Sequence, residues 1–126
     1  MTPIATENAP AAIGAYSQAV AHGGVVYCSG QIGLKPDGTW AGSDVKTQTE
    51  AALKNLDAIL TAAASSRDQV IRATIFLASM EDFGVVNEAY AAFFGEHRPA
   101  RACVEASRLP KDALVEISCI AASSLV

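Results

Sequence analysis

The pattern of hydrophobic and polar positions near the start of the chain contains two short strand-like runs, which predict β-strands. The runs cover residues 17–21 and 25–29 and are separated by His22-Gly23-Gly24, a turn signal of the hairpin kind. The next segment, QIGLKPDGTWAG, contains Pro36-Asp37-Gly38, where proline fixes φ and glycine tolerates a positive φ. The sequence therefore predicts a hairpin followed by an exposed loop.

Two later segments have the periodicity of amphipathic helices. From Ser43 to about Ala64 the apolar residues fall on one stripe, and Ser43 or Asp44 can cap the first turn. The second segment starts at Ser79, followed shortly by two acids that suit the positive end of a helix dipole, and Gly95 suits its end. The predicted buried stripes are Val45, Ala52, Leu56, Ile59 and Ala63 in the first helix, and Phe83, Val86, Tyr90 and Phe93 in the second.

The remaining segments predict three more strands. Residues 70–78 alternate two apolar-leaning sets, as in a strand covered on both faces. Residues 97–120 predict two strands joined by a turn at 109–112, since small or apolar residues alternate with others on either side of it. In the first of the three strands the expected sets are Ile71, Ala73, Ile75 and Leu77 on one face, and Val70, Arg72, Thr74 and Phe76 on the other.

This order of elements predicts an α+β sandwich in which one mixed β-sheet carries both helices on one face. The opposite face would also be apolar, as Val70, Phe76, Val115 and Ile117 indicate. Large exposed apolar surfaces mark interaction sites, and a closed homo-oligomer is an economical way to cover one. We therefore expect a single domain over residues 1–126 that assembles as a homo-oligomer.

The composition supports an oligomer and narrows the choice of partners. Only 17% of the residues are charged, against about 25% in a typical soluble domain. The net charge is −4 and the basic residues are scattered, so nucleic acid and anionic membranes are not expected partners. The segment MTPIATENAP lacks the basic and apolar regions of a signal peptide, and no run approaches the roughly 18 apolar residues of a membrane span. We expect a soluble, cytoplasmic protein.

The sequence lacks the residue patterns of several common kinds of functional site. Cys28, Cys103 and Cys119 are far apart in the sequence and not in CxxC spacing, which predicts neither a disulfide framework nor a thiolate metal site. Only two histidines are present, without metal-binding spacing. There is no GxSxG, GxxxxGK[ST] or GxGxxG motif, so triad hydrolases, NTPases and dinucleotide-binding proteins have no support.

Two charged residues stand out on the last two predicted strands, which we expect to be adjacent in the sheet. Arg101 carries a permanently charged planar fork, which on an apolar strand requires either a protein carboxylate or an anionic ligand. Glu116 interrupts the apolar run LVEISCI, where the surroundings raise the pKa of a carboxyl group toward the range of a general acid or base. A structural interpretation remains open for both: an ion pair at a strand end or interface, with Arg101 or Arg72 as the partner of Glu116.

Four weaker candidates complete the set. Cys103 shares a strand face with Arg101, but no histidine has an evident role as its base, so we favour a lining role over covalent catalysis. Tyr16 and Ser29 lie near the ends of the hairpin and offer hydroxyl groups, although ordinary edge residues would look the same. Asn87 lies beside the apolar stripe of the second helix, where helix propensity gives it no advantage; a packing or capping hydrogen bond is the alternative.

Several ordered motifs combine these residues: GAYSQAV, VVYCSGQIGL, DFGVVNEAYAAFF and RPARACVEASRLPKDALVEISCIA. With the spacing between them, they resemble the YjgF/YER057c/UK114 family, also called Rid, over essentially the whole chain. The resemblance implies a chorismate-mutase-like α+β subunit, a homotrimer with a central barrel and ligand clefts between subunits. It also implies hydrolysis of reactive enamines and imines, such as 2-aminoacrylate and 2-iminobutanoate, to 2-keto acids and ammonia, without a cofactor or a metal.

Position by position, the resemblance assigns catalytic roles to Arg101 and Glu116. Arg101 would hold the substrate carboxylate, and Glu116 would orient and deprotonate a water molecule. The family arginine marks the subgroup with imine deaminase activity. The resemblance assigns substrate contacts to Tyr16, Ser29, Gly30, Asn87 and Cys103.

The sequence departs from the family pattern at three positions. Ala15 and Gly33 stand where proline is usual, which could loosen loops that border the cleft. Ala102 replaces serine or threonine, and strand alternation should point it away from Arg101.

Three alternative functions remain open beside the imine deaminase. The first is a deaminase for another enamine acid, such as aminomuconate or the aminoacrylate of pyrimidine breakdown. The second is a trimer that binds small carboxylates without turnover. The third is an endoribonuclease, although the acidic balance of the chain does not suit the phosphate contacts that RNA requires.

Overall fold

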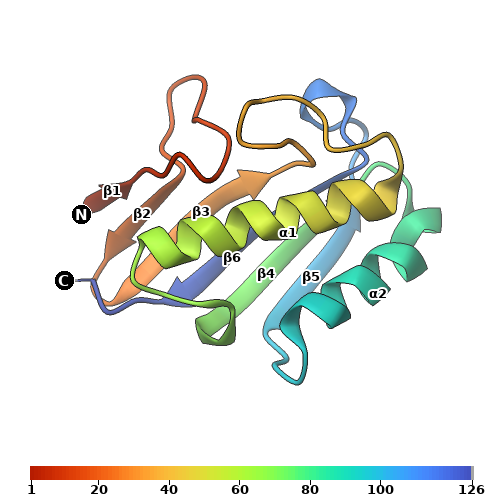
Figure 1. Ribbon diagram of the computed structural model, residues 1–126. Helices are drawn as coiled ribbons and strands as arrows, with labels where there is room; N and C mark the ends of the chain where they lie inside the picture. Colours follow the sequence, from red (N-terminus) through yellow and green to blue (C-terminus); the bar gives the residue numbers. More distant parts are fainter. Residues whose placement is uncertain (126) are drawn as a thin grey trace.

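The computed structural model describes residues 1–125 and shows one six-stranded mixed sheet with two helices on one of its faces (Figure 1). The predicted α+β class, with both helices on the same face, is therefore confirmed. The strand order is β1-β2-β3-β6-β4-β5, with β4 and β5 parallel and every other pair antiparallel. The strands are β1 (Thr2–Ile4), β2 (Ala19–His22), β3 (Val25–Gln31), β4 (Val70–Leu77), β5 (Ala100–Glu105) and β6 (Val115–Ala122).

The predicted hairpin is formed by β2 and β3. Gly23 and Gly24 connect the two strands with φ angles of 61° and 80°, the left-handed region that favours glycine. The short strand β1 pairs with β2 at the edge of the sheet and was not predicted, because three residues are too few for a periodic signal.

Both helices were predicted correctly. Helix α1 (Val45–Ala62) is capped by Asp44, whose carboxylate accepts a hydrogen bond from the Thr47 backbone N–H. Helix α2 (Phe83–Phe94) follows a 3₁₀ turn at Met80–Asp82 and ends at Gly95, with a φ of 65°.

The hydrophobic core lies between the helices and the sheet. On β6 the buried residues alternate strictly, and they face the helices: Val115, Ile117, Cys119 and Ala121. Leu53, Ile59 and Leu60 of α1 pack against this face. Burying each of the larger side chains contributes about 1.5–3 kcal/mol to folding, which makes this layer the main source of stability.

A β-bulge in β4 corrects the predicted pattern of that strand. The pairing of β4 with β6 shifts register between Val70 and Arg72. The extra residue in a bulge changes which side of the sheet the preceding side chains point to. Val70 therefore lies in the core with Ala73, Ile75 and Leu77, whereas Ile71 is 51% exposed. The prediction that Ile71 shares the face of Ala73 was wrong.

The last two strands are joined by a turn at Pro110–Asp112, as predicted, but they are not neighbours in the sheet. β4 lies between β5 and β6 and pairs with both, parallel to β5 and antiparallel to β6. In β6, buried apolar residues alternate with half-buried ones, which suits a strand in the middle of the sheet. β5 carries charged and exposed residues at both ends and forms the sheet edge, where one row of backbone groups needs no partner strand.

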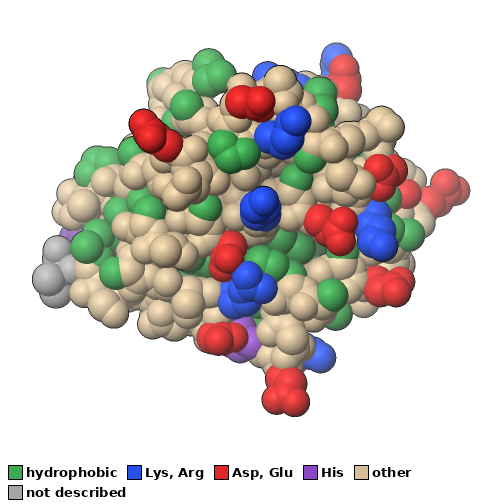
Figure 2. Space-filling model, viewed as in Figure 1, with side chains coloured by type: hydrophobic (Ala, Val, Ile, Leu, Met, Phe, Trp, Pro, Cys, Tyr) green, Lys and Arg blue, Asp and Glu red, His purple; other side chains and the backbone are tan. Residues whose placement is uncertain are grey.

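The face of the sheet away from the helices is apolar and uncovered in the single chain. Tyr27 is 50% exposed and Val104 is 44% exposed, and Phe76 and Ile120 are half-buried there. Of the residues expected on this face, only Phe76 lies on it, because Val70, Val115 and Ile117 are buried under the helices. Figure 2 shows that the opposite, helix-covered side carries interspersed acidic and basic side chains, as a solvated surface does.

Residues 1–125 lack two other features. No helix there combines the length and the hydropathy needed to cross a membrane. The same residues include no group of three or more His, Cys, Asp or Glu side chains placed to hold a metal ion.

Candidate active site

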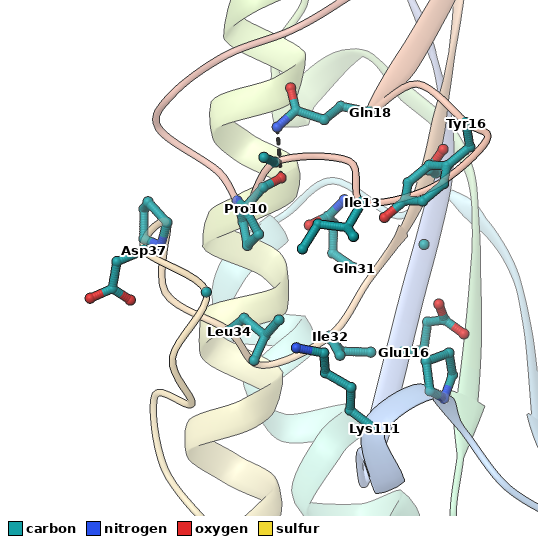
Figure 3. Close-up of a pocket in the computed structure, with 16 residues that line it drawn as sticks. Pro10, Ile13, Tyr16, Gln18, Gln31, Ile32, Leu34, Asp37, Lys111 and Glu116 are labelled. Atoms are coloured by element: carbon teal, nitrogen blue, oxygen red, sulfur yellow. Dashed lines mark hydrogen bonds between the residues drawn. The ribbon is translucent and has the colours of Figure 1, made fainter.

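Four of the predicted site residues line one open cavity of about 840 Å³ (Figure 3). Its walls come from three loops and the end of β3: residues 10–18, 29–34, 36–38 and 110–111. The predicted residues in it are Tyr16, Ser29, Gly30 and Glu116, which we call the glutamate cluster. Most other lining residues are apolar, and they include Pro10, Ile13, Ile32 and Leu34.

Glu116 projects from β6 on the face away from the helices. It is half-buried, and burial raises the pKa of its carboxyl group. Gly30 makes room for it, since a Cβ at position 30 would lie 2.6 Å from Glu116 Oε2. The glycine therefore allows the carboxylate to approach the backbone of β3.

Ser29 fastens the segment that carries Tyr16. Its Oγ donates a hydrogen bond to the Ser17 carbonyl at 2.6 Å, and its backbone N–H donates to the Gln18 carbonyl at 2.9 Å. Because its proton is engaged, the hydroxyl oxygen can accept a hydrogen bond from a ligand but not donate a second one. Tyr16 is 53% exposed at the cavity mouth.

Three buried amide side chains hold the irregular walls of the cavity, and sequence reasoning did not single them out. Gln18 Nε2 donates to the Pro10 carbonyl at 2.8 Å. Asn55 Nδ2 donates to the Leu34 carbonyl at 2.8 Å, and Gln48 Oε1 accepts from the Leu114 backbone N–H at 3.0 Å. For Gln48 and Asn55 the available signal was an amide at a helix position facing the core, since buried polar groups need partners; Gln18 lies in the loop before β2 and gave no such signal. The loops are thus fixed to the fold rather than free.

The other predicted residues form a second group on the opposite, helix-covered face, which we call the arginine cluster: Asn87, Arg101 and Cys103. Arg101 Nη1 donates to Asn87 Oδ1 at 2.7 Å. The guanidinium carbon lies 5.0 Å from the centre of the Tyr90 ring and 5.7 Å from that of Phe83, within cation–π range. Asn87 and the two rings hold the guanidinium over α2.

Cys103 lies beside Arg101 on β5, opposite Ile75 of β4. Burial raises the pKa of its thiol, and the charge of Arg101 offsets this only in part. A thiol that resists ionisation is a poor nucleophile, which agrees with a lining role.

The two clusters do not meet within one chain. Arg101 lies opposite Ala73 on β4 and Glu116 lies opposite Phe76, so their side chains leave opposite faces of the sheet. The structural interpretation in which these two residues pair within the chain is therefore wrong. The prediction that they lie on adjacent strands was also wrong, because β4 separates them.

The fold and the sequence of this chain match those of a known family of proteins. The model of the endoribonuclease L-PSP family matches residues 6–123. The chain belongs to this family, which is the YjgF or Rid family, and the predicted resemblance is confirmed.

Known proteins resemble the chain along nearly its whole length. A RutC family protein of Pyrococcus horikoshii is 50% identical, and the 2-iminobutanoate/2-iminopropanoate deaminase of Salmonella typhimurium is 47% identical; in both comparisons 94% of each chain is covered. The crystal structure of Escherichia coli TdcF with bound serine superposes with a TM-score of 0.93 at 42% identity, covering 98% of this chain and 100% of TdcF.

Proposed function

We propose that the protein hydrolyses reactive 2-imino and 2-enamino acids to 2-keto acids and ammonia, at sites formed between the subunits of a homotrimer. The observation that carries the proposal is the placement of Arg101 and Glu116 on opposite faces of one sheet. A site that uses both residues requires a second copy of the chain. Support comes from a relative named as a deaminase of such imines and from another with an amino acid bound.

The uncovered apolar face supports assembly. Tyr27 and Val104 are about half exposed there, and a monomer rarely leaves such side chains together in water. Three sheets packed around an axis would cover them, and each sheet edge at β5 would bring its arginine cluster to a neighbouring subunit. The central barrel that the resemblance implies is part of this proposal.

In the proposed site Arg101 binds the substrate carboxylate. The planar fork of guanidinium N–H donors matches the two carboxylate oxygens. Asn87 already orients one Nη group, so less freedom is lost when the substrate binds. The carboxylate would thereby place the imine carbon next to the glutamate cluster of the neighbouring subunit.

Glu116 then activates water. Its raised pKa suits a group that accepts a proton and returns it. Water adds to C2 of the imine while Glu116 takes one of its protons. That proton passes to nitrogen and leaves a carbinolamine at C2. The remaining hydroxyl proton then passes through Glu116 to the same nitrogen as the C–N bond breaks, and the 2-keto acid and ammonia leave. An enamine first takes a proton at C3 and gives one up from nitrogen to become the imine.

The remaining residues bind rather than react. Ser29 and Tyr16 offer oxygens at the cavity, Gly30 lets the Glu116 carboxylate stand close to β3, and Cys103 lines the site as a neutral thiol. The proposed steps use only water and the side chains of Arg101, Glu116 and the residues that bind the substrate.

The test generates 2-iminobutanoate with an L-amino-acid oxidase and traps it with semicarbazide. Wild-type protein should suppress the semicarbazone and release 2-oxobutanoate and ammonia, whereas Arg101→Ala and Glu116→Gln should not. The exposed Arg98→Ala, three residues from Arg101, serves as a control and should act like wild type. The proposal fails if wild type has no effect or if Arg101→Ala works equally well.

A further inference from the structure

Lys111 brings a cation into the cavity of the glutamate cluster. It lies on the turn between β5 and β6 and lines the cavity together with Glu116 (Figure 3). The figure shows its side chain extending from the turn into the cavity, toward the wall formed by Ile32 and Leu34. Among residues 1–125 it is the one cationic side chain that lines this cavity.

The backbone that carries Lys111 is unusual. Lys111 has a φ of 56° and a ψ of 25°, and Asp112 has a φ of 57°. Two consecutive non-glycine residues in the left-handed region are unfavourable, and such strain gathers at functional sites. A glycine would adopt this turn without strain. The presence of a lysine at this position therefore indicates that its side chain has a function.

No protein group within residues 1–125 neutralises this ammonium. Lys111 forms no ion pair and donates no side-chain hydrogen bond there. Asp112 is paired with Arg108 at 2.7 Å. Asp37, the other acid lining the cavity besides Glu116, accepts hydrogen bonds from the backbone N–H and the hydroxyl of Thr39.

We infer that Lys111 binds a second carboxylate at the far end of the substrate, which makes 2-imino dicarboxylic acids preferred substrates of this protein. The inference rests on the proposed function. Arg101 of a neighbouring subunit holds the carboxylate next to the imine carbon, and Glu116 faces that carbon. The substrate side chain then extends toward the wall of Ile32 and Leu34, where the ammonium of Lys111 meets its terminal carboxylate.

The experiment compares two imines of equal chain length. 2-Iminoglutarate is generated with L-glutamate oxidase, and 2-iminopentanoate is generated from norvaline with an L-amino-acid oxidase. Wild type should hydrolyse the dicarboxylate with the higher kcat/KM. A hydrogen bond to a charged group is worth roughly tenfold in binding, so Lys111→Met should lower the ratio of the two kcat/KM values about tenfold.

Three further variants control for charge and folding. Lys111→Gly removes the charge and suits the left-handed backbone, so it should fold at least as well as wild type and show the same loss. Lys111→Arg should keep most of the preference. Lys54→Met removes one exposed lysine of α1 outside the cavity and should leave the ratio unchanged.

The outcomes separate this inference from the proposed function. An unchanged ratio in both Lys111→Met and Lys111→Gly, with 2-iminopentanoate still hydrolysed, overturns the inference alone. An equal loss on both imines also overturns it, since Lys111 would then act on the shared part of the substrate. If wild type hydrolyses neither imine, the proposed function fails. Calorimetry with 2-oxoglutarate and 2-oxopentanoate then tests Lys111 directly, and equal binding in wild type overturns the inference.

Discussion

The side chains of Arg101 and Glu116 leave opposite faces of one sheet, with β4 between their strands. A neighbouring subunit must therefore supply one of them to any site that contains both. The proposed function therefore requires contact between two chains, whatever the exact substrate is.

The first prediction is complementation between inactive variants. Co-expressed Arg101→Ala and Glu116→Gln chains should regain imine hydrolysis, because some interfaces combine an intact arginine with an intact glutamate. Random mixing restores about one quarter of the sites of a cyclic oligomer. Rates of 2-iminobutanoate hydrolysis by purified mixed oligomers measure this. Co-expressed Arg101→Ala and Arg101→Met should regain nothing, and a lack of rescue in the first mixture would show that no site combines Arg101 of one chain with Glu116 of another.

The second prediction concerns Asn87. Its side chain accepts the 2.7 Å hydrogen bond from Arg101, so Asn87→Ala leaves the guanidinium less ordered. We expect KM for 2-iminobutanoate to rise about fivefold, the equivalent of one hydrogen bond, with a smaller change in kcat. Glu88→Ala changes the exposed neighbouring residue of α2 and should leave both constants unchanged. A fall in kcat alone would argue against a role in positioning Arg101.

The third prediction uses Gly30. A methyl group there would lie 2.6 Å from Glu116 Oε2, and the carboxylate would have to move. Because misplacing a catalytic group by about 1 Å can cost about 100-fold, Gly30→Ala should lower kcat by up to that factor. The melting temperature should change little, since the end of the Glu116 side chain can shift away from the new methyl group. Gly84→Ala is the matched control, because its Cβ would meet open space, and it should retain full activity.

The fourth prediction concerns Gly33, where the family pattern has proline. That glycine loosens this loop stays a prediction, and the structure adds a packing role: Gly33 lets the loop approach α1, since a Cβ would lie 2.6 Å from the Cα of Gln48. Helix backbone cannot yield as a side chain can. Gly33→Ala should therefore lower the free energy of unfolding by about 1–3 kcal/mol in denaturant titrations. Unchanged stability would show that the loop can move away from the helix.

The fifth prediction is a pH dependence of stability. Burial raises the pKa of Glu116 above its ordinary 4.5, so the folded chain binds this proton more tightly than the unfolded chain. The resulting stabilisation is fully present below pH 4.5 and is lost as the pH rises through the raised pKa. Glu116→Gln should not show this loss. Melting temperatures of both proteins across the acidic range measure the difference, and parallel curves would show that the pKa is not raised in the assembled protein.

Local features were readable from the sequence because they depend on neighbouring residues. Gly23 and Gly24 set the hairpin turn, Asp44 and Gly95 mark a helix start and a helix end, and the apolar stripes identify the buried faces of both helices. The order of these elements was enough for the fold class. The motifs were enough for the family, and they named the residues of both clusters.

Alternation along a strand does not reveal which strands become its neighbours. The sequence placed β5 next to β6 because they follow each other, whereas the sheet inserts β4 between them. It also placed Ile71 on the same face as Ala73, because the bulge after Val70 exists only in the pairing with β6. Both errors concern long-range hydrogen bonds, which leave no period in the sequence.

The sequence by itself determined the elements other than β1, the family and the candidate residues for the proposed chemistry. Only the tertiary structure decided that Glu116 and Lys111 share a cavity and that Arg101 faces α2 on the other side of the sheet. The physical reason is that strand order and bulges set the face from which a side chain projects, and these arise from contacts between residues far apart in the chain.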